Sequence, residues 1–123
     1  MTTITDVGAI GINVRDQDKA LAFFTDTLGF EKRLDAPISP GMRWVTVAPP
    51  SAGTSIALIA SEDGQVGTDT GIRFTVPDAA AERTALEAGG VAVGELLQWP
   101  DVPPMFAFDD PDGNRFYIVE EMA

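Results

Sequence analysis

Apolar residues alternate with small or polar ones over residues 10–14, and the spacing of apolar residues then changes to that of a helix. The alternation predicts a strand whose apolar face carries Ile10, Ile12 and Val14. The helical spacing predicts an amphipathic helix whose apolar face carries Ala20, Phe23, Phe24 and Leu28. We expect Asp16 or Asp18 to cap the start of this helix, and Gly29 to end it at positive φ.

The same strand–helix pattern returns in the second half of the chain. Residues 71–78 alternate again and end in an aspartate, residues 79–88 again favour a helix, and Gly89-Gly90 follows as a stop. Few letters are identical between the two copies, so the repeat is inferred from the pattern. Two unrelated strand–helix units are the alternative interpretation.

The remaining segments predict further strands after each helix. In the first half these are residues 30–35, 42–48 and 54–60, with a loop at 36–41 and a turn at 49–53. In the second half, extended runs are expected at 91–93, 95–99, 105–108 and 115–120, with a proline-rich loop at 100–104 and a turn at 109–114.

These elements predict an α+β fold in which one domain, residues 1–123, holds two βαβββ modules. Module one covers residues 4–60, a linker covers 61–69, and module two covers 70–121. Each module has one helix to cover one face of its sheet. The opposite face must therefore meet the other half, a partner subunit or a ligand.

Composition narrows the classes of function. The chain has 123 residues and a net charge of −11, and because such a surface repels phosphate backbones we expect no nucleic-acid partner. No apolar run approaches the length of about 20 residues that a bilayer span needs, and no signal pattern opens the sequence. We therefore expect a cytoplasmic protein with no membrane contact. The absence of cysteine and histidine excludes thiolate nucleophiles, a Ser-His-Asp triad and the commonest transition-metal ligands.

Three features of the chain resemble the vicinal oxygen chelate superfamily, also called the glyoxalase, bleomycin-resistance and dioxygenase superfamily. The first is Val14-Arg15-Asp16 followed by ALAFFTDTLGF at residues 20–30, which is similar to the family pattern V-x-D … A-x-x-F-Y-t-d-x-L-G-F. The second is Asp110-Pro111-Asp112-Gly113-Asn114, which resembles the turn of the family's final hairpin. The third is the spacing of the two halves, so the resemblance spans nearly the whole chain.

The resemblance implies both a fold and a chemistry. Members of the superfamily fold as two βαβββ modules whose sheets curl into an incomplete barrel around a cavity, which is often completed in a dimer. Many of them hold a divalent metal with His and Glu, and the metal activates vicinal oxygens of the substrate. The corresponding positions in this chain are Ala9, Ala57, Gly71 and Tyr117. None of them is His or Glu, so we expect no metal and no cofactor.

The uncovered sheet faces supply the expected ligand-binding residues. Arg73 interrupts an otherwise apolar strand and can pair with a carboxylate or polarised oxygen of a ligand, or else with a protein carboxylate or solvent. Asn13 and Thr46 can donate or accept hydrogen bonds to a ligand, with local backbone bonding as the alternative.

Larger side chains on the same faces are expected to form an adaptable wall. This wall consists of Trp44, Trp99, Met105 and Tyr117, and ordinary core or dimer packing is the alternative. Asp109, Asp110 and Asp112 resemble a calcium cluster, but only part of the oxygen spacing of a calcium loop is present, which favours a turn.

The leading functional hypothesis is a metal-independent protein of this superfamily that binds a small molecule and sequesters an aromatic or cationic compound such as an antibiotic. The alternative is a lyase, isomerase or dioxygenase that acts on a small oxygenated substrate. A third interpretation is an interaction module without a small ligand. The uncovered faces and the resemblance together predict a homodimer.

Overall fold

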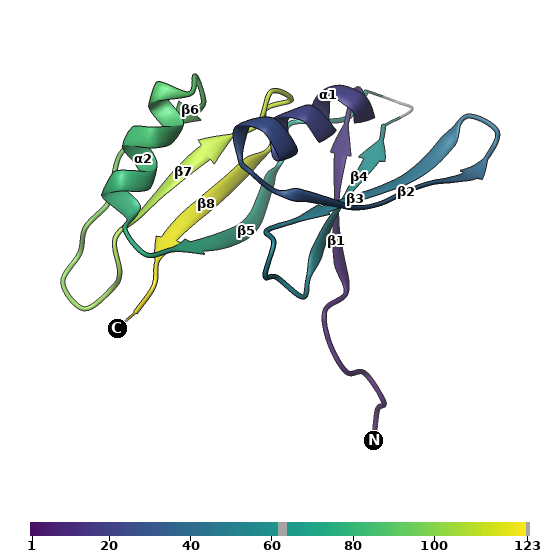
Figure 1. Cartoon of the computed structure of the whole chain (residues 1–123). Coiled ribbons are helices and arrows are strands. Elements are labelled where there is room, and N and C mark those ends of the chain that lie inside the picture. Colours follow the sequence, from purple (N-terminus) through teal and green to yellow (C-terminus); the bar gives the residue numbers. More distant parts are fainter. Residues whose placement is uncertain (62–63, 123) are drawn as a thin grey trace. The chain divides into compact units, whose positions relative to one another are not determined.

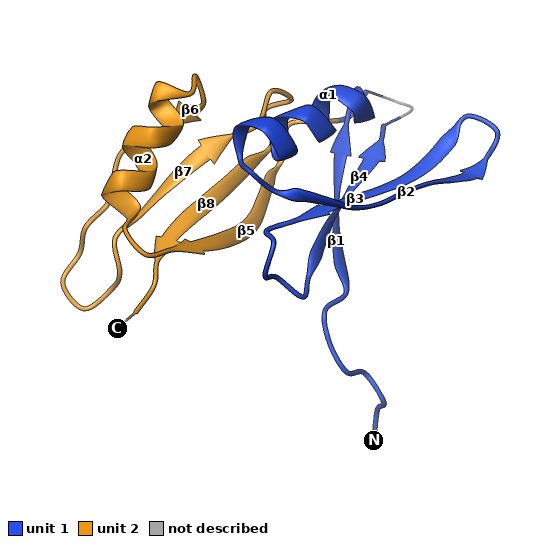
Figure 2. Cartoon of the chain, viewed as in Figure 1, with its two compact units in different colours: residues 1–65 blue, residues 66–123 orange. Residues whose placement is uncertain are grey.

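The computed structural model describes residues 1–61 and 64–122, and the chain folds as two compact units, residues 1–65 and residues 66–123 (Figure 2). Each unit contains a strand, a helix and three further strands in that order, so the predicted βαβββ pattern and the α+β class are confirmed. The linker predicted at 61–69 includes residues 62–63, which lie outside the described residues.

The first unit is built on a mixed four-stranded sheet with the order β1-β4-β3-β2 (Figure 1). Strand β1 is parallel to β4, and β3 is antiparallel to β4 and to β2. The elements of this unit are β1 (Ala9–Val14), α1 (Gln17–Ala22), the π-helical segment η1 (Phe23–Thr27), β2 (Glu31–Ser39), β3 (Met42–Ala48) and β4 (Ser55–Ala60).

The first helix begins and ends where the sequence predicts. The side chain of Asp16, one of the two predicted caps, accepts hydrogen bonds from the backbone N–H groups of Asp18 and Lys19. The helix widens into the π-helical segment at Phe23, which the apolar spacing does not distinguish from an α-helix. Gly29 follows at φ 75°, the positive value that the sequence predicts.

The core of the first unit lies between α1 and the sheet face that carries the even-numbered residues of β1. Ile12 and Val14 are buried there, whereas Ile10, at the start of the strand, is 37% exposed. Ala20 and Phe24 contribute buried side chains from the helical segment. From β3 and β4 the same face adds Val45, Val47, Ile56 and Leu58, all of them buried.

The second unit repeats this plan with the sheet order β5-β8-β7-β6. Strand β5 is parallel to β8, and β7 is antiparallel to β8 and to β6. Its elements are β5 (Asp69–Val76), α2 (Ala79–Ala88), β6 (Ala92–Val93), β7 (Met105–Asp109) and β8 (Arg115–Glu120). Neither sheet closes on itself within the described residues.

Helix α2 matches its predicted bounds, and aromatic rings fill the sheet face beneath it. Asp78 caps the helix by accepting from the backbone N–H of Ala81, and Gly90 follows the helix at φ 85°. The rings of Phe74, Phe108 and Phe116 stack on one another with centroids 5.4–6.3 Å apart. This stack gives the second sheet a rigid, apolar underside.

Two predicted boundaries are wrong. Strand β2 continues to Ser39 through most of the loop expected at 36–41, because β2 is an edge strand and Pro37 sits at a bulge that needs no N–H from it. The run at 95–99 forms one bridge, Leu97 to Met105, instead of a strand. Continuing this register would place Trp99 opposite Pro103, which has no N–H for the ladder.

The turn predicted at 109–114 is confirmed, and it also anchors the start of the second unit. The carboxylate of Asp110 accepts hydrogen bonds from the backbone N–H groups of Asp112 and Asn114 and from the Asn114 side chain. The buried Asn114 oxygen in turn accepts from the N–H groups of Gly67 and Thr68. The three aspartates therefore do not gather around a common point for a cation, since Asp109 instead pairs with Arg115. In the described part of the chain, no helix has the length and hydropathy of a membrane span.

Candidate ligand-binding site

The second sheet has one face away from its aromatic stack, which we call the open face. The register of β5, β7 and β8 places odd-numbered residues on it, while Phe74, Phe108 and Phe116 take the other side. Most residues of the open face are exposed or half-buried, so they can contact a ligand. They are Arg73, Thr75, Met105, Ala107, Asp109, Arg115, Tyr117 and Val119.

Arg73, Tyr117 and Asp69 form a compact cluster on the open face. Arg73 pairs with Tyr117 across β5 and β8, and its guanidinium carbon lies 4.6 Å from the centre of the phenol ring. The hydroxyl of Tyr117 donates to Oδ2 of Asp69 over 2.6 Å. A cation, an aromatic ring and a carboxylate are thus held in contact at an exposed position.

A bulge in β5 orients this cluster. The strand register shifts between Asp69 and Arg73, and Gly71 between them has φ 69°, a value that favours glycine. The N–H of Gly71 donates to Oδ1 of Asp69 over 3.0 Å, and the carbonyl of Gly71 accepts from Nη1 of Arg73 over 2.7 Å. One glycine therefore positions both charged groups around Tyr117.

The hydrogen bond between Tyr117 and Asp69 separates the pKa values of the two groups. Donation from the Tyr117 hydroxyl is the main cause that lowers the pKa of Asp69, with the N–H of Gly71 second. The carboxylate in turn raises the pKa of Tyr117 above its ordinary value. At neutral pH the phenol is therefore a protonated donor and Asp69 is an ionised acceptor.

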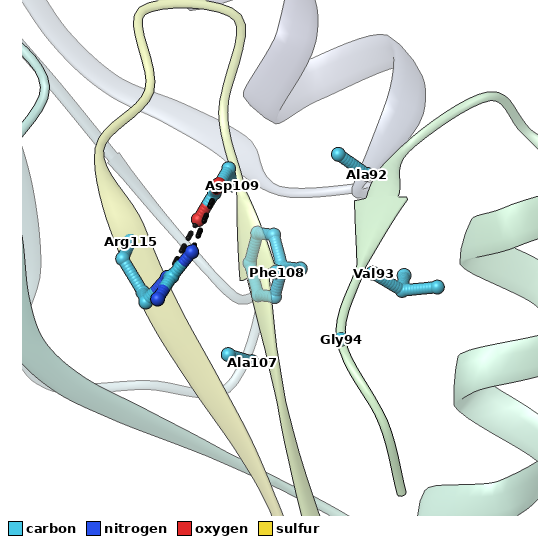
Figure 3. Close-up of a pocket in the computed structure, with 7 residues that line it drawn as sticks. All are labelled: Ala92, Val93, Gly94, Ala107, Phe108, Asp109 and Arg115. Carbon is cyan, nitrogen blue, oxygen red and sulfur yellow. Dashed lines mark hydrogen bonds and ion pairs between the residues drawn. The ribbon is translucent and has the colours of Figure 1, made fainter.

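A second charged pair lies two residues along β8 from Tyr117. Nε of Arg115 donates to Oδ1 of Asp109 over 3.0 Å, and Nη2 reaches Oδ2 at 3.4 Å. Figure 3 shows these two side chains pointing toward each other, beside a pocket of about 170 Å³. The pocket is lined by Ala92, Val93, Gly94, Ala107, Phe108, Asp109 and Arg115.

The predicted ligand-binding residues of the second unit fall into two groups. Arg73 and Tyr117 meet in the cluster, and Met105 lies on the same face of β7, opposite Val119. Trp99 instead lies in the loop between Leu97 and Met105 and is 51% exposed. Trp99 therefore lies outside the strands, although the wall was expected on the sheet faces, and its contact with a ligand stays a prediction.

The other three predicted residues belong to the first unit. Asn13 lies on β1, Trp44 and Thr46 lie on β3, and the pairing of both strands with β4 places all three on the face away from α1. Trp44 is 37% exposed, whereas Thr46 is 6% exposed and so offers a ligand little surface. Their role in binding stays a prediction.

Three residues of the candidate site, Asp69, Asp109 and Arg115, are not among the ligand-binding residues that the sequence predicts. Asp69 was assigned to the linker, although the period-2 pattern of Gly71 and Arg73 continues back to it. Asp109 falls in the predicted turn, where the only other role weighed for it is a calcium cluster, and Arg115 falls in the extended run expected at 115–120. Starting the alternation two residues earlier would have placed Asp69 on the face of Arg73 and Tyr117.

The comparisons with known proteins agree with the fold. A family model described as the Glyoxalase/Bleomycin resistance protein/Dioxygenase superfamily matches residues 6–118. The chain belongs to this superfamily.

Three relatives of the chain illustrate the similarity. A superfamily member from Sphaerobacter thermophilus has a crystal structure with TM-score 0.91 and 41% identity, covering 98% of this chain and 100% of that one. TnmS3, an antibiotic binding protein from Streptomyces sp. CB03234, matches with TM-score 0.88 and 32% identity over 99% of this chain and 100% of its own. YetH of Bacillus subtilis is 30% identical over 122 residues, 95% of this chain and 99% of YetH.

The metal that the superfamily resemblance implies does not fit the residues at the corresponding positions. Ala9, Ala57 and Gly71 have no donor atom in their side chains. The hydroxyl of Tyr117 stays protonated in its hydrogen bond to Asp69, so the phenol does not offer an anionic ligand. Among the described residues, no group of three or more His, Cys, Asp or Glu side chains is arranged to hold an ion.

Proposed function

We propose that this superfamily member binds and sequesters a small aromatic or cationic compound, such as an antibiotic, on the open face of its second sheet and without a metal ion. The observation that carries the proposal is the exposed contact of Arg73 with Tyr117 and of Tyr117 with Asp69. These groups offer stacking, hydrogen bonding and charge at one place, which are the interactions that fix small polar ligands in proteins.

The chemistry of the cluster fits a planar ligand. A flat ring can continue the stack on the outer side of the Arg73 guanidinium, or it can displace the guanidinium from Tyr117. Asp69 is ionised near neutral pH, as its lowered pKa also ensures in more acidic solution, so it favours a ligand with a cationic or hydrogen-donating group. The net charge of −11 adds a long-range attraction for cations.

Similarity to an antibiotic binding protein supports the same proposal. TnmS3 is 32% identical to this chain, and the match covers 99% of this chain. We infer that this chain has kept a comparable binding activity, with the Arg73–Tyr117–Asp69 cluster as its own recognition element.

Isothermal titration calorimetry with two antibiotics tests the proposal. Doxorubicin is aromatic and cationic, and bleomycin is a glycopeptide antibiotic. We expect saturable binding of at least one of them that is unchanged after dialysis against EDTA. Replacing Tyr117→Ala should weaken that binding about tenfold or more, because the stacking surface and the donor are both lost.

Thr84→Ala is the matched control, since Thr84 is an exposed residue of helix α2, which covers the other face of the sheet. This variant should bind like the parent protein. Absence of saturable heat with both compounds, or binding that EDTA abolishes, would contradict the proposal.

We also propose that the protein acts as a homodimer. The hairpin of β2 and β3 exposes large apolar side chains that a second copy could cover, namely Leu34, Ile38, Met42 and Trp44. Light scattering should give the mass of two chains, and the mass of one chain at micromolar concentration would contradict a dimer.

A further inference from the structure

The pocket at the β6 edge of the second sheet has the size of one six-membered ring. Its volume is about 170 Å³, and an apolar protein cavity of about 150 Å³ is known to accept benzene. Small residues leave this room, because Ala92, Gly94 and Ala107 line the pocket with little side-chain bulk (Figure 3). A flat ring can therefore lie against β6 and β7.

One wall of the pocket is polar and has both donors and acceptors. Arg115 and Asp109 neutralise each other in their ion pair, so the wall does not demand a ligand of either charge. A guanidinium carries five N–H groups, and Arg115 directs only Nε and one Nη2 hydrogen toward Asp109. The remaining N–H groups of Arg115 can therefore donate to a ligand, while the adjacent carboxylate of Asp109 accepts from the same ligand.

The opposite rim of the pocket is held in place by two short hydrogen bonds. The N–H of Gly94 donates to the carbonyl of Ala107 over 2.7 Å. The carbonyl of Gly94 accepts from Nε of Arg83, on helix α2, also over 2.7 Å. Because both backbone groups of Gly94 are fixed, the pocket is formed before a ligand arrives.

The pocket and the cluster of Arg73, Tyr117 and Asp69 are neighbours along β8. Arg115 and Tyr117 lie on the same side of β8, two residues and therefore about 7 Å apart along the strand. A ligand with one ring in the pocket can therefore place a second group over Tyr117.

We propose that this pocket binds a planar ring whose edge carries a hydrogen-bond acceptor next to a donor, as in an aromatic carboxamide. The acceptor receives an N–H of Arg115 and the donor binds the carboxylate of Asp109. The proposal rests on the proposed function, because it names the chemical class of the ligand that the open face takes. It adds a ring subsite that lies outside the Arg73–Tyr117–Asp69 cluster.

A nitrogen–proton correlation NMR titration of the full chain tests this subsite, with benzamide and benzoate as probes. Benzamide carries the acceptor–donor edge, whereas benzoate carries two acceptors and meets the carboxylate of Asp109. We expect saturable shifts of the amide signals of Gly94, Ala107 and Asp109 with benzamide, at a dissociation constant on the order of 1 mM for so small a ligand. Benzoate should bind at least about tenfold more weakly.

Two substitutions separate the ring volume from the polar wall. Ala107→Leu fills the pocket and should abolish the benzamide shifts, while Ala85→Leu adds the same bulk at an exposed position of α2 that does not line the pocket and should leave them unchanged. If Ala107→Leu fails to fold, Ala92→Leu fills the same space from β6. Asp109→Asn should reverse the preference, because Arg115 then lacks its carboxylate partner and takes benzoate.

The outcomes distinguish this proposal from the proposed function. Benzamide shifts that do not saturate, or that Ala107→Leu leaves intact, overturn the ring subsite. Doxorubicin binding that Tyr117→Ala weakens, together with benzamide shifts that do not saturate, overturns the subsite while the proposed function stands. Saturable benzamide shifts with a preference that Asp109→Asn reverses support the subsite whether or not either antibiotic binds.

Discussion

The hydroxyl of Tyr117 donates to the carboxylate of Asp69 over 2.6 Å, although the two residues are 48 positions apart in the chain. The parallel pairing of β5 with β8 brings them together, and the bulge at Gly71 turns the carboxylate toward the ring. The carbonyl of Gly71 in the same bulge also accepts a hydrogen bond from Arg73, whose guanidinium lies over the ring of Tyr117. Substitutions on β5 or on β8 can therefore test the hydrogen bond between Tyr117 and Asp69.

The ionisation of Tyr117 reports directly on its bond to Asp69. The chain has one tyrosine, so the near-ultraviolet absorbance of tyrosinate follows this residue alone. Because Asp69 raises the pKa of Tyr117, we expect a titration midpoint above the ordinary value of about 10. Asp69→Asn should bring the midpoint back toward that value. Asp101→Asn removes the same charge from an exposed loop and should leave the midpoint where it was.

The same bond predicts how the stability of the fold depends on pH. Asp69 has a lowered pKa, so its contribution is present above the ordinary pKa of a carboxyl and is lost as the pH falls through its folded value. Tyr117 has a raised pKa, so its contribution is present below about pH 10 and is lost as the pH rises further. Tyr117→Phe should therefore lower the free energy of unfolding at neutral pH, by an amount that shrinks at both extremes. An equal loss at every pH in urea unfolding would contradict this.

Gly71→Ala should destabilise the protein by about 1 kcal/mol, because a side chain is strained at φ 69° even though no atom lies within 4 Å of the new Cβ. The strain should also displace Asp69 and thereby lower the titration midpoint of Tyr117. Urea unfolding and the tyrosinate titration measure the two effects. Gly8→Ala is the control, since its Cβ would also meet open space but its φ is not positive, and it should change neither quantity.

Helix α1 offers a test of which aspartate caps it. Asp16→Ala should cost about 1 kcal/mol of stability, because its side chain accepts two backbone N–H groups at the start of the helix. Asp18→Ala should cost much less, since Asp18 is exposed and shares Arg43 with Asp35. Thermal unfolding of both variants measures the difference, and equal losses would contradict the assignment of Asp16 as the cap.

Neighbouring residues on β4 test the assignment of sheet faces in the first unit. Leu58 faces α1 and is 1% exposed, so Leu58→Ala should cost about 2–5 kcal/mol. Ile59 faces the other side and is 40% exposed, so Ile59→Ala should cost less than half as much. Its side chain lies across Gly11, where a Cβ would come within 2.7 Å of it. Chemical denaturation of the two variants decides the point, and a larger loss for Ile59→Ala would reverse the faces.

Local patterns predicted those parts of the fold that depend on nearby residues. The caps at Asp16 and Asp78 and the glycines at the helix ends were predictable because a cap acts within one turn of the helix. The alternation of Ile12 and Val14 also located the buried face correctly. By contrast, the bulge at Gly71 and the extension of β2 through Pro37 depend on the neighbouring strands. No local pattern specifies these neighbours.

The candidate site was only partly predictable for the same reason. Arg73 and Tyr117 stood out because they are polar or aromatic residues at alternating positions of strands that otherwise carry apolar residues. Asp69 and Asp109 did not, because a strand end and a turn are ordinary places for an aspartate. The pocket beside Ala107 could not be predicted at all, since it depends on how Gly94 is held by Arg83 and by the backbone of β7.

The parallel pairing of the first and last strands in each unit also bears on synthesis by the ribosome. Ala9 lies beside Ser55 and Asp69 beside Arg115, and within the described residues β1 and β5 each have a single sheet neighbour, the last strand of the same unit. While the chain is being made, the segment from Ile10 to Val14 therefore leaves the ribosome unpaired, before its partner strand β4 has been synthesised. During that interval another nascent copy can pair with it, and slow translation between α1 and β4 would lengthen the exposure to aggregation.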